Sequence, residues 1–355
     1  MAYSDARPLR SAIIGCGAIA HEHARFLGPS ARAQFVGAVD KSAAIASYFV
    51  DHLGAAASFT STSDLYSIAA PDIVHILTPP GTHDELVREA LDAGCHVICE
   101  KPMANSLAQT ESLLDHAAER GRVLIESANS LWNENVLAIR RVVEHGTLGD
   151  VREVEVAISL DLAAGPFGDL NLPDAGVRLP GGAVHDFLPH VCALFLALSG
   201  QEDVDEVTGT LENLSGNARV QYDFLDCRIR ANGVRGRLGL SPDIQPAAFR
   251  VAVCGNQGGA ETDLFNPYLR VTGGKYLGKL APVELLVSGK RMFGSGLRNL
   301  YDKVAGHTPY HSVTAMLDTI YEAVQRGSPV PITPQSIRQR ARLVDSIVAL
   351  RTTRA

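Results

Sequence analysis

The chain has 355 residues, a length that favours two domains. Hydrophobic residues make up 46% of it, and the net charge of −7 argues against a basic face for nucleic acid. The N-terminal MAYSDARPLR lacks the apolar core of a signal peptide, and no apolar run approaches the roughly 20 residues that span a bilayer. We therefore expect a cytoplasmic protein with no nucleic-acid or membrane partner.

The six cysteines and the histidines do not indicate a metal site. No CxxC pair occurs, and no set of His, Cys and carboxylate residues has the spacing of metal ligands. Most cysteines lie in apolar runs, so we expect buried free thiols. His21 and His23 fall in the first predicted helix, where we expect solvated positions on its surface.

The first predicted unit is a strand, a glycine turn and a helix. Residues 9–14 are short and apolar, as a buried parallel strand is. Residues 15–20 then read GxGxxA: Gly15 permits the tight turn, Gly17 lets a pyrophosphate approach the backbone, and Ala20 lets the helix pack closely. Ala18 and Ile19 open the helix, whose free N–H groups favour phosphate. The spacing predicts a dinucleotide site.

An acidic residue follows the second predicted strand, 34–39. Asp40 stands where a carboxylate accepts hydrogen bonds from the adenosine ribose. Its charge would repel a 2′-phosphate, which favours NAD. Lys41 could pair with that phosphate, so NADP stays open as the alternative cofactor.

Strands and helices alternate up to about residue 127. Strands are expected at 57–59, 73–77, 95–99 and 122–125, with helices at 42–53, 83–93 and 106–120. Such alternation predicts an α/β domain with a doubly wound parallel sheet over residues 1–127. Two loops, Thr78–His83 and Glu100–Pro102, follow parallel strands and so face the ligand crevice.

The pattern changes over residues 128–355, which we assign to an α+β domain with an open, mainly antiparallel sheet. Strands are expected at 151–160, 204–211, 218–224, 227–231, 237–240, 249–254 and 261–265, and helices at 133–145, 183–198, 311–326 and 335–350. The last helix could pack back on the first domain. Residues 161–180 read as a loop. The basic run 275–303 reads as a solvated loop, although it could also meet a phosphate on a substrate.

Two stretches carry candidate chemistry. Lys101 follows the fifth strand, where a lysine could orient a substrate hydroxyl or lose its proton, or simply lie in a surface turn. Asp186 and His190 are four residues apart and share a helix face, an arrangement that suits acid–base chemistry but is also common on helix surfaces.

The motifs GCGAIA, TPPGTH, EKP and GGxxxDxxxH, in this order, resemble the Gfo/Idh/MocA oxidoreductase family. The resemblance implies a Rossmann domain followed by an open-sheet domain that commonly mediates homo-oligomers, here a homodimer or homotetramer. It also implies hydride transfer between a nicotinamide and a hydroxyl carbon of a sugar, a cyclitol or a related compound.

The resemblance also implies residue roles. Lys101 and His190 match the two catalytic positions, either of which could be the final base, and Asp186 matches the substrate-binding acid. Thr78, Pro79 and His83 match the loop beside the nicotinamide ribose, and Glu100 is expected near the nicotinamide. Asn129, Trp132 and Arg178 complete the expected substrate site.

Two departures from the family pattern affect the substrate site. Leu131 replaces a usual basic side chain, so the pocket loses a cation. Pro189 replaces a usual glycine, and it would kink the helix or mark its start. His185 is expected to point away from the catalytic face. Two other functions stay open: a lyase- or hydrolase-type enzyme that holds NAD tightly in a redox-neutral cycle, and a non-catalytic sensor of dinucleotides.

Overall fold

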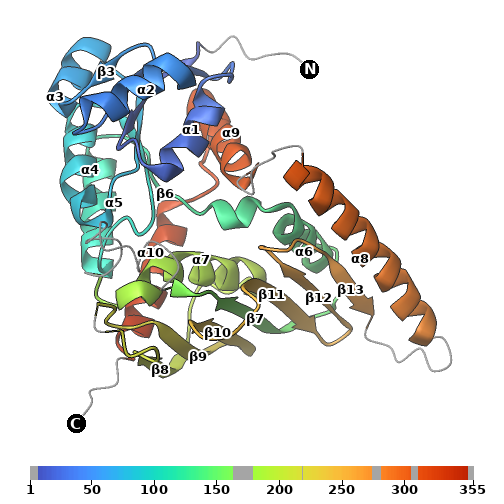
Figure 1. The fold of residues 1–355 in the computed structure, drawn as a ribbon. Coiled ribbons are helices and arrows are strands. Elements are labelled where there is room, and N and C mark those ends of the chain that lie inside the picture. The colour runs from blue at the N-terminus through green and yellow to red at the C-terminus, as the bar shows by residue number, and fades with distance from the viewer. Residues whose placement is uncertain (1–6, 163–178, 218, 274–280, 305–310, 351–355) are drawn as a thin grey trace. The chain divides into compact units, whose positions relative to one another are not determined.

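The computed structural model describes residues 7–162, 179–217, 219–273, 281–304 and 311–350 (Figure 1). The chain forms two compact units. Unit 1 comprises residues 1–129 and 310–341, and unit 2 comprises residues 130–309 and 342–355. The C-terminal segment 310–341 thus belongs with the N-terminal unit. The sequence pattern assigns this segment to the second domain, with a last helix that could pack back on the first.

Unit 1 contains a six-stranded parallel sheet in the order β3-β2-β1-β4-β5-β6. This order is that of a Rossmann fold, and it changes direction between β1 and β4, where ligands bind. The strands are β1 (Leu9–Ile14), β2 (Ala33–Val39), β3 (Ser58–Phe59), β4 (Ile73–Ile76), β5 (His96–Cys99) and β6 (Leu124–Glu126). The predicted doubly wound parallel sheet is confirmed.

Helices cover both faces of this sheet (Figure 1). The helices α1, α2 and α9 pack on one face, and α4 and α5 pack together on the other. Ser42 and Ser106 cap α2 and α5, because each hydroxyl accepts a backbone N–H of the first turn. The helices are α1 (Ala18–Leu27), α2 (Ala43–Leu53), α3 (Thr62–Asp64), η1 (Leu65–Ala69), η2 (Pro80–Thr82), α4 (His83–Asp92), α5 (Leu107–Glu119) and α9 (His311–Arg326).

The helix α10 (Pro334–Val348) begins in unit 1 and ends in unit 2. Within unit 1 its Arg340 forms an ion pair with Glu126 at the end of β6, and both side chains are at most 8% exposed. The same carboxylate accepts the N–H of Met103 at 3.0 Å. The buried pair therefore fixes the returning helix to the sheet.

Unit 2 contains a seven-stranded sheet in the order β13-β12-β11-β7-β10-β9-β8. Of the pairs in this sheet, β7–β10 is parallel and the others are antiparallel, so the predicted mainly antiparallel sheet is confirmed. Its strands are β7 (Val151–Ser159), β8 (Glu206–Glu212), β9 (Phe224–Ala231), β10 (Val234–Ser241), β11 (Ala248–Gly255), β12 (Gly258–Asp263) and β13 (Arg270–Gly273). The unit also contains most of η3 (Asn129–Trp132), together with α6 (Glu134–Glu144), α7 (Gly182–Ser199) and α8 (Ala281–Val304).

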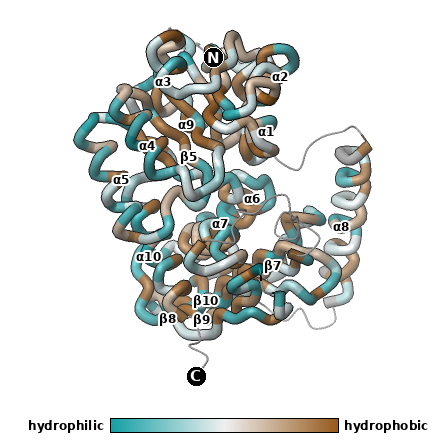
Figure 2. The backbone as a smooth tube through the Cα atoms, turned by 60° about the vertical axis from the view of Figure 1, so that its left-hand side comes forward, coloured by the Kyte–Doolittle hydropathy of each residue, from teal (hydrophilic) through white to brown (hydrophobic). Residues whose placement is uncertain are grey.

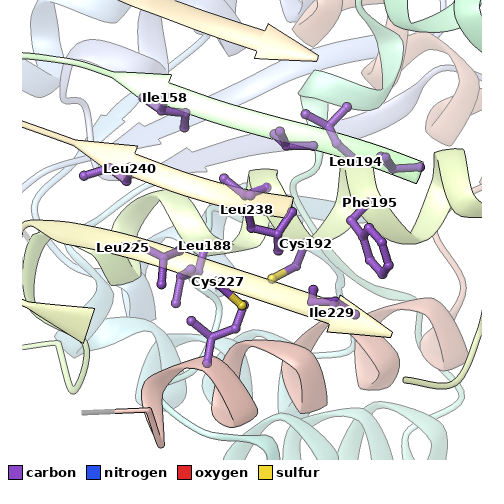
Figure 3. Packing of buried hydrophobic residues seen from close by; sticks show 14 of the residues in the cluster. Ile158, Leu188, Cys192, Leu194, Phe195, Leu225, Cys227, Ile229, Leu238 and Leu240 are labelled. Carbon is purple, nitrogen blue, oxygen red and sulfur yellow. The ribbon is translucent and has the colours of Figure 1, made fainter. Parts of the chain in front are cut away.

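One face of this sheet packs on α7 (Figure 3). Leu188, Cys192 and Phe195 of α7 lie against strand residues such as Cys227 and Leu238. By length and composition α7 is the one helix of the described segments that could cross a membrane, but 72% of it is buried inside the unit. It is therefore explained as a core helix.

Two sequence predictions in unit 2 are wrong. Residues 219–223 of the predicted strand 218–224 form no strand, because local side chains bind this backbone instead: Asn213 donates to the Val220 carbonyl and Asp223 accepts the N–H of Leu214. The run 275–303 is not a loop, because from residue 281 it forms α8. The predicted loop 161–180 lies mostly outside the described residues.

Candidate active site

The first glycine of the turn after β1 is required by its surroundings. Gly15 has φ +93°, a conformation that side chains rarely adopt. A Cβ there would lie 2.7 Å from Thr78 Cγ2 and 2.9 Å from the backbone of Leu77. The Gly15 N–H donates to the Val39 carbonyl at 2.8 Å. The turn thus packs directly against the loop that follows β4.

The second glycine faces open space. Gly17 is the N-cap of α1, and no side chain caps this helix end. A Cβ on Gly17 would meet nothing within 4 Å, and Ala18 beside it is exposed while Ile19 is half-buried. An uncovered helix N-terminus with free room beside its first N–H groups fits the pyrophosphate of a dinucleotide.

The carboxylate of Asp40 is held at the end of β2. One of its oxygens accepts the N–H of Cys16 at 3.0 Å, and the other accepts the N–H of Ser42 at 2.9 Å. The side chain is therefore fixed beside the glycine turn, where it can also accept from ribose hydroxyls. Lys41 next to it is exposed.

His83 connects the two loops that follow β4 and β5. Its Nε2 lies 2.8 Å from the Thr78 carbonyl, and its Nδ1 lies 2.9 Å from the Pro102 carbonyl. Burial lowers the pKa of His83, and the hydrogen bonds to the two carbonyls offset this only in part. The ring is fully buried, whereas Pro79 is exposed, so His83 acts by joining the loops.

Glu100 and Lys101 follow β5 at the same edge of the sheet. The Lys101 N–H donates to Glu100 Oε2 at 3.2 Å, and both residues are half-buried. Burial raises the pKa of Glu100, but His23, Lys101 and Ser127 outweigh it and lower the pKa to about 2. A carboxylate that stays ionised therefore lies beside Lys101.

A buried polar chain behind Glu100 was missed from the sequence. His23 is fully buried, so the prediction that it lies on the helix surface is wrong. Its Nδ1 lies 2.7 Å from Nδ1 of His75 in β4, whose Nε2 lies 2.8 Å from the Tyr321 hydroxyl. Two signals could have indicated this: His75 interrupts an apolar strand, and His23 is on the buried stripe of α1 with Ala20 and Leu27.

In unit 2, α7 carries the other candidate catalytic residues. Asp186 and His190 lie one turn apart, and both are half-buried. His185 is buried and its Nδ1 accepts the N–H of Gly181 at 3.3 Å, so it stabilises the helix start. Pro189 lies inside α7, which begins at Gly182, so the proline does not mark the start of the helix.

The remaining expected substrate residues are less informative. Asn129 is half-buried, and its amide donates to the Ser312 hydroxyl at 3.4 Å. Leu131 and Trp132 are half-buried in the short helix η3. Arg178 lies outside the described residues.

A hollow of about 450 Å³ lies at the opposite edge of the unit 1 sheet. It is lined by residues such as Leu9, Asp72 and His96, which stand at or just before the amino ends of their strands. In open α/β sheets ligands bind at the carboxyl ends, so this hollow is not the dinucleotide site.

Comparison with known proteins identifies the family. Residues 9–127 match a model described as an oxidoreductase family with an NAD-binding Rossmann fold, and residues 136–261 match the GFO/IDH/MocA C-terminal domain. Together these matches cover more than half of the chain. The protein belongs to the Gfo/Idh/MocA oxidoreductase family.

Individual relatives are more distant. The chain is 31% identical to D-glucoside 3-dehydrogenase of Escherichia coli over 145 residues, 41% of each protein. It is 25% identical to inositol 2-dehydrogenase of Rhizobium meliloti over 272 residues, 69% of this chain and 78% of the relative. The chain spans less than half the length of the first curated relatives that it matches.

The solved structure of a levoglucosan dehydrogenase in complex with NADH and levoglucosan has the same fold. Its TM-score is 0.80, with 19% identity over 97% of each chain.

Proposed function

We propose that this protein is a nicotinamide-dependent dehydrogenase that transfers hydride between NAD and a hydroxyl carbon of a sugar, a cyclitol or a sugar derivative. The observation that carries the proposal is the position of Lys101. It is the second residue after β5, at the carboxyl edge that also presents the open Gly17 turn and the Thr78 loop. The family and the named activities of its relatives support the same reaction type.

Unit 1 supplies the residues that would hold the dinucleotide. The N–H groups beside Gly17 and Ala18 would bind the pyrophosphate, and Asp40 would accept from the adenosine ribose. Thr78 and Pro79 would lie beside the nicotinamide ribose. NAD supplies the hydride acceptor when bound. Asp40 favours NAD over NADP because its charge would repel a 2′-phosphate.

Three side chains would act on the hydroxyl groups of the substrate. His190 would take this proton as the hydride leaves the same carbon. Lys101 would donate a hydrogen bond to that oxygen and polarise it, and Asp186 would hold a neighbouring hydroxyl.

The substrate class follows from the chemistry of these residues. Asp186 suits a compound with adjacent hydroxyl groups, and relatives named for a glucoside and for inositol act on such compounds. Leu131 offers no positive charge, so an anionic group at that point would gain nothing. Neutral polyols are therefore the first candidates, with Asn129 and Trp132 beside them.

A substrate panel tests the proposal. Sugars, inositols, sugar phosphates and nucleotide sugars are offered with NAD and separately with NADP, and reduced nicotinamide is followed by absorbance. Turnover of one compound class is expected. Lys101→Met should lower kcat by about 10²–10⁴-fold and keep NAD affinity. Exposed Lys290→Met is the control with the same chemical change, and its kcat should stay near that of the wild type.

The panel has two contradicting outcomes. Equal kcat in the Lys101→Met variant and the wild type would remove Lys101 from the reaction. Silence across the panel with exchangeable, weak dinucleotide binding would favour a sensor over an enzyme.

We also propose that the protein forms a homo-oligomer through α8. This helix exposes an unusual number of large apolar side chains, and Figure 2 shows hydrophobic residues along it. They are Val283, Leu285, Leu286, Val287, Met292, Phe293, Leu297, Leu300, Tyr301 and Val304. Light scattering should give a mass of two or four chains, and Leu286→Glu with Phe293→Glu should lower it. A monomeric wild type would contradict the proposal.

A further inference from the structure

The buried chain behind Glu100 continues to the first strand of the sheet. The Tyr321 hydroxyl donates to Ser11 Oγ at 2.8 Å, and the Ser11 hydroxyl donates to the Leu9 carbonyl at 2.8 Å. The four side chains that form this series of hydrogen bonds are 0% exposed: Ser11, His23, His75 and Tyr321. Burying so many polar groups in the core of a Rossmann sheet is costly, unless each finds a partner.

The Leu9 carbonyl gives this chain a direction. A carbonyl only accepts, so the Ser11 hydroxyl must donate to it, and Tyr321 then donates to Ser11. The phenol has one proton, so Nε2 of His75 must donate to the Tyr321 oxygen. Burial, together with the neighbouring His23, lowers the pKa of His75 well below its ordinary value. A neutral His75 then accepts at Nδ1, and Nδ1 of His23 must donate to it.

The direction of these hydrogen bonds determines whether Nε2 of His23 points a lone pair or an N–H at Glu100. Its Nε2 has no hydrogen-bond partner among the described residues and lies 3.7 Å from Glu100 Oε1. A neutral His23 would point a lone pair at this carboxylate, which is repulsive. A protonated His23 would point an N–H at it, which is attractive at this ion-pair distance.

We propose that His23 is the imidazolium of a buried ion pair with Glu100, held in that state by the hydrogen bonds through His75, Tyr321 and Ser11. The four residues are positioning residues for Lys101, and this step rests on the proposed function. When His23 balances part of the charge of Glu100, the carboxylate attracts the Lys101 ammonium less strongly. Lys101 can then donate a hydrogen bond to the substrate oxygen.

The other charges around Glu100 do not replace His23. His83 on α4 is fully buried, and burial lowers its pKa. Burial and the nearby carboxylates raise the pKa of Cys99, so the thiol is neutral. Glu126 is paired with Arg340. Apart from His23, Lys101 is thus the cation in the described part of unit 1 that lowers the pKa of Glu100.

Nitrogen NMR of the full-length protein tests the ion pair without any substrate. Two-bond ¹H–¹⁵N spectra of ¹⁵N-histidine-labelled protein report the charge and tautomer of each ring, and His23→Gln and His75→Gln assign the signals. At about pH 7 we expect a doubly protonated His23 and a His75 protonated at Nε2. The proposal is overturned if His23 is neutral with its proton on Nε2 and His75 is protonated at Nδ1, because the chain then runs in reverse.

Tyr321→Phe removes the hydroxyl that determines which atoms donate in this series of hydrogen bonds, and the phenyl ring keeps the packing. His75 can then change tautomer, so we expect the signal of doubly protonated His23 at about pH 7 to be weaker than in the wild type. Tyr66→Phe is the matched control, because the Tyr66 hydroxyl has no hydrogen-bond partner in the described part of the chain. A doubly protonated His23 signal as strong in Tyr321→Phe as in the wild type contradicts the proposal.

Turnover supplies a second readout that a merely structural role would not move. In Tyr321→Phe, Lys101 should keep its proton to higher pH, which shifts the basic limb of the kcat profile up by about one pH unit at unchanged KM for NAD. A failed substrate search would refute the proposed function and leave the NMR result decisive for the ion pair. Normal turnover with a neutral His23 would refute the ion pair alone.

Discussion

Replacing Gly17 by serine should separate cofactor binding from folding. Gly17 has φ −76° and ψ −168°, an extended conformation open to serine, and its Cβ would meet no atom within 4 Å. A serine hydroxyl at this N-cap can also accept an N–H of the first turn of α1, which glycine cannot. Gly17→Ser should therefore raise the free energy of unfolding by a few tenths of a kcal/mol.

The same side chain would occupy the space through which the pyrophosphate approaches the helix. Loss of a charge-assisted hydrogen bond there costs about 1.5–3 kcal/mol, which corresponds to roughly 10–150-fold weaker NAD binding. Calorimetric titration with NAD measures the affinity, and urea unfolding without NAD measures the stability. NAD binding as tight as in the wild type would refute the placement of the pyrophosphate at Gly17.

Gly15→Ala, in the same turn, should lower the stability of the fold, whereas Gly17→Ser should weaken NAD binding. The left-handed conformation of Gly15 costs alanine about 1–2 kcal/mol, and the clash with Thr78 costs about 1–3 kcal/mol more. The variant should lose about 2–5 kcal/mol of stability in urea, whether or not NAD is present. A wild-type unfolding midpoint would show that the turn relaxes more easily than its contacts indicate.

Three further changes test charged groups in unit 1. Asp40→Asn should narrow the ratio of kcat/KM for NAD over NADP by about tenfold, whereas an equal loss with both cofactors would contradict the role of the charge. Arg340→Met leaves the buried Glu126 carboxylate unpaired and should cost about 3–5 kcal/mol in urea unfolding. Arg338→Met, at a partly exposed ion pair, should cost about 0–1 kcal/mol. The pKa of Glu100 is lowered from 4.5 to about 2, so its stabilising contribution is complete above pH 4.5 and is lost as the pH falls toward 2. The stability difference between the wild type and Glu100→Gln should shrink over that interval, and a difference independent of pH would contradict the shift.

The N-terminal half was largely predictable because local signals agree with the fold. The glycine turn, the capping serines and the short apolar strands each determine a local conformation, and they occur in the order of a Rossmann sheet. Gly15 and Gly17 could be assigned distinct roles because the turn and the phosphate contact require different properties.

The rest depends on contacts between distant segments. His23 and Tyr321 are almost 300 residues apart in sequence, and neither periodicity nor spacing reports that both contact His75. The helix α8 contains Gly289, Gly294 and Gly296 and several basic residues, which resemble a loop. Its apolar side chains are exposed and therefore do not mark a single buried face, which is the pattern that predicts a helix from sequence.

The measurement that tests the central claim most directly counts reduced nicotinamide per subunit. The enzyme is mixed with a large excess of NAD and the polyol panel, and NADH is followed to completion beside product analysis. A dehydrogenase should form many equivalents of NADH per subunit, one for each oxidised substrate molecule. Product that accumulates with at most one equivalent of NADH would contradict this account and identify a redox-neutral enzyme that holds its NAD.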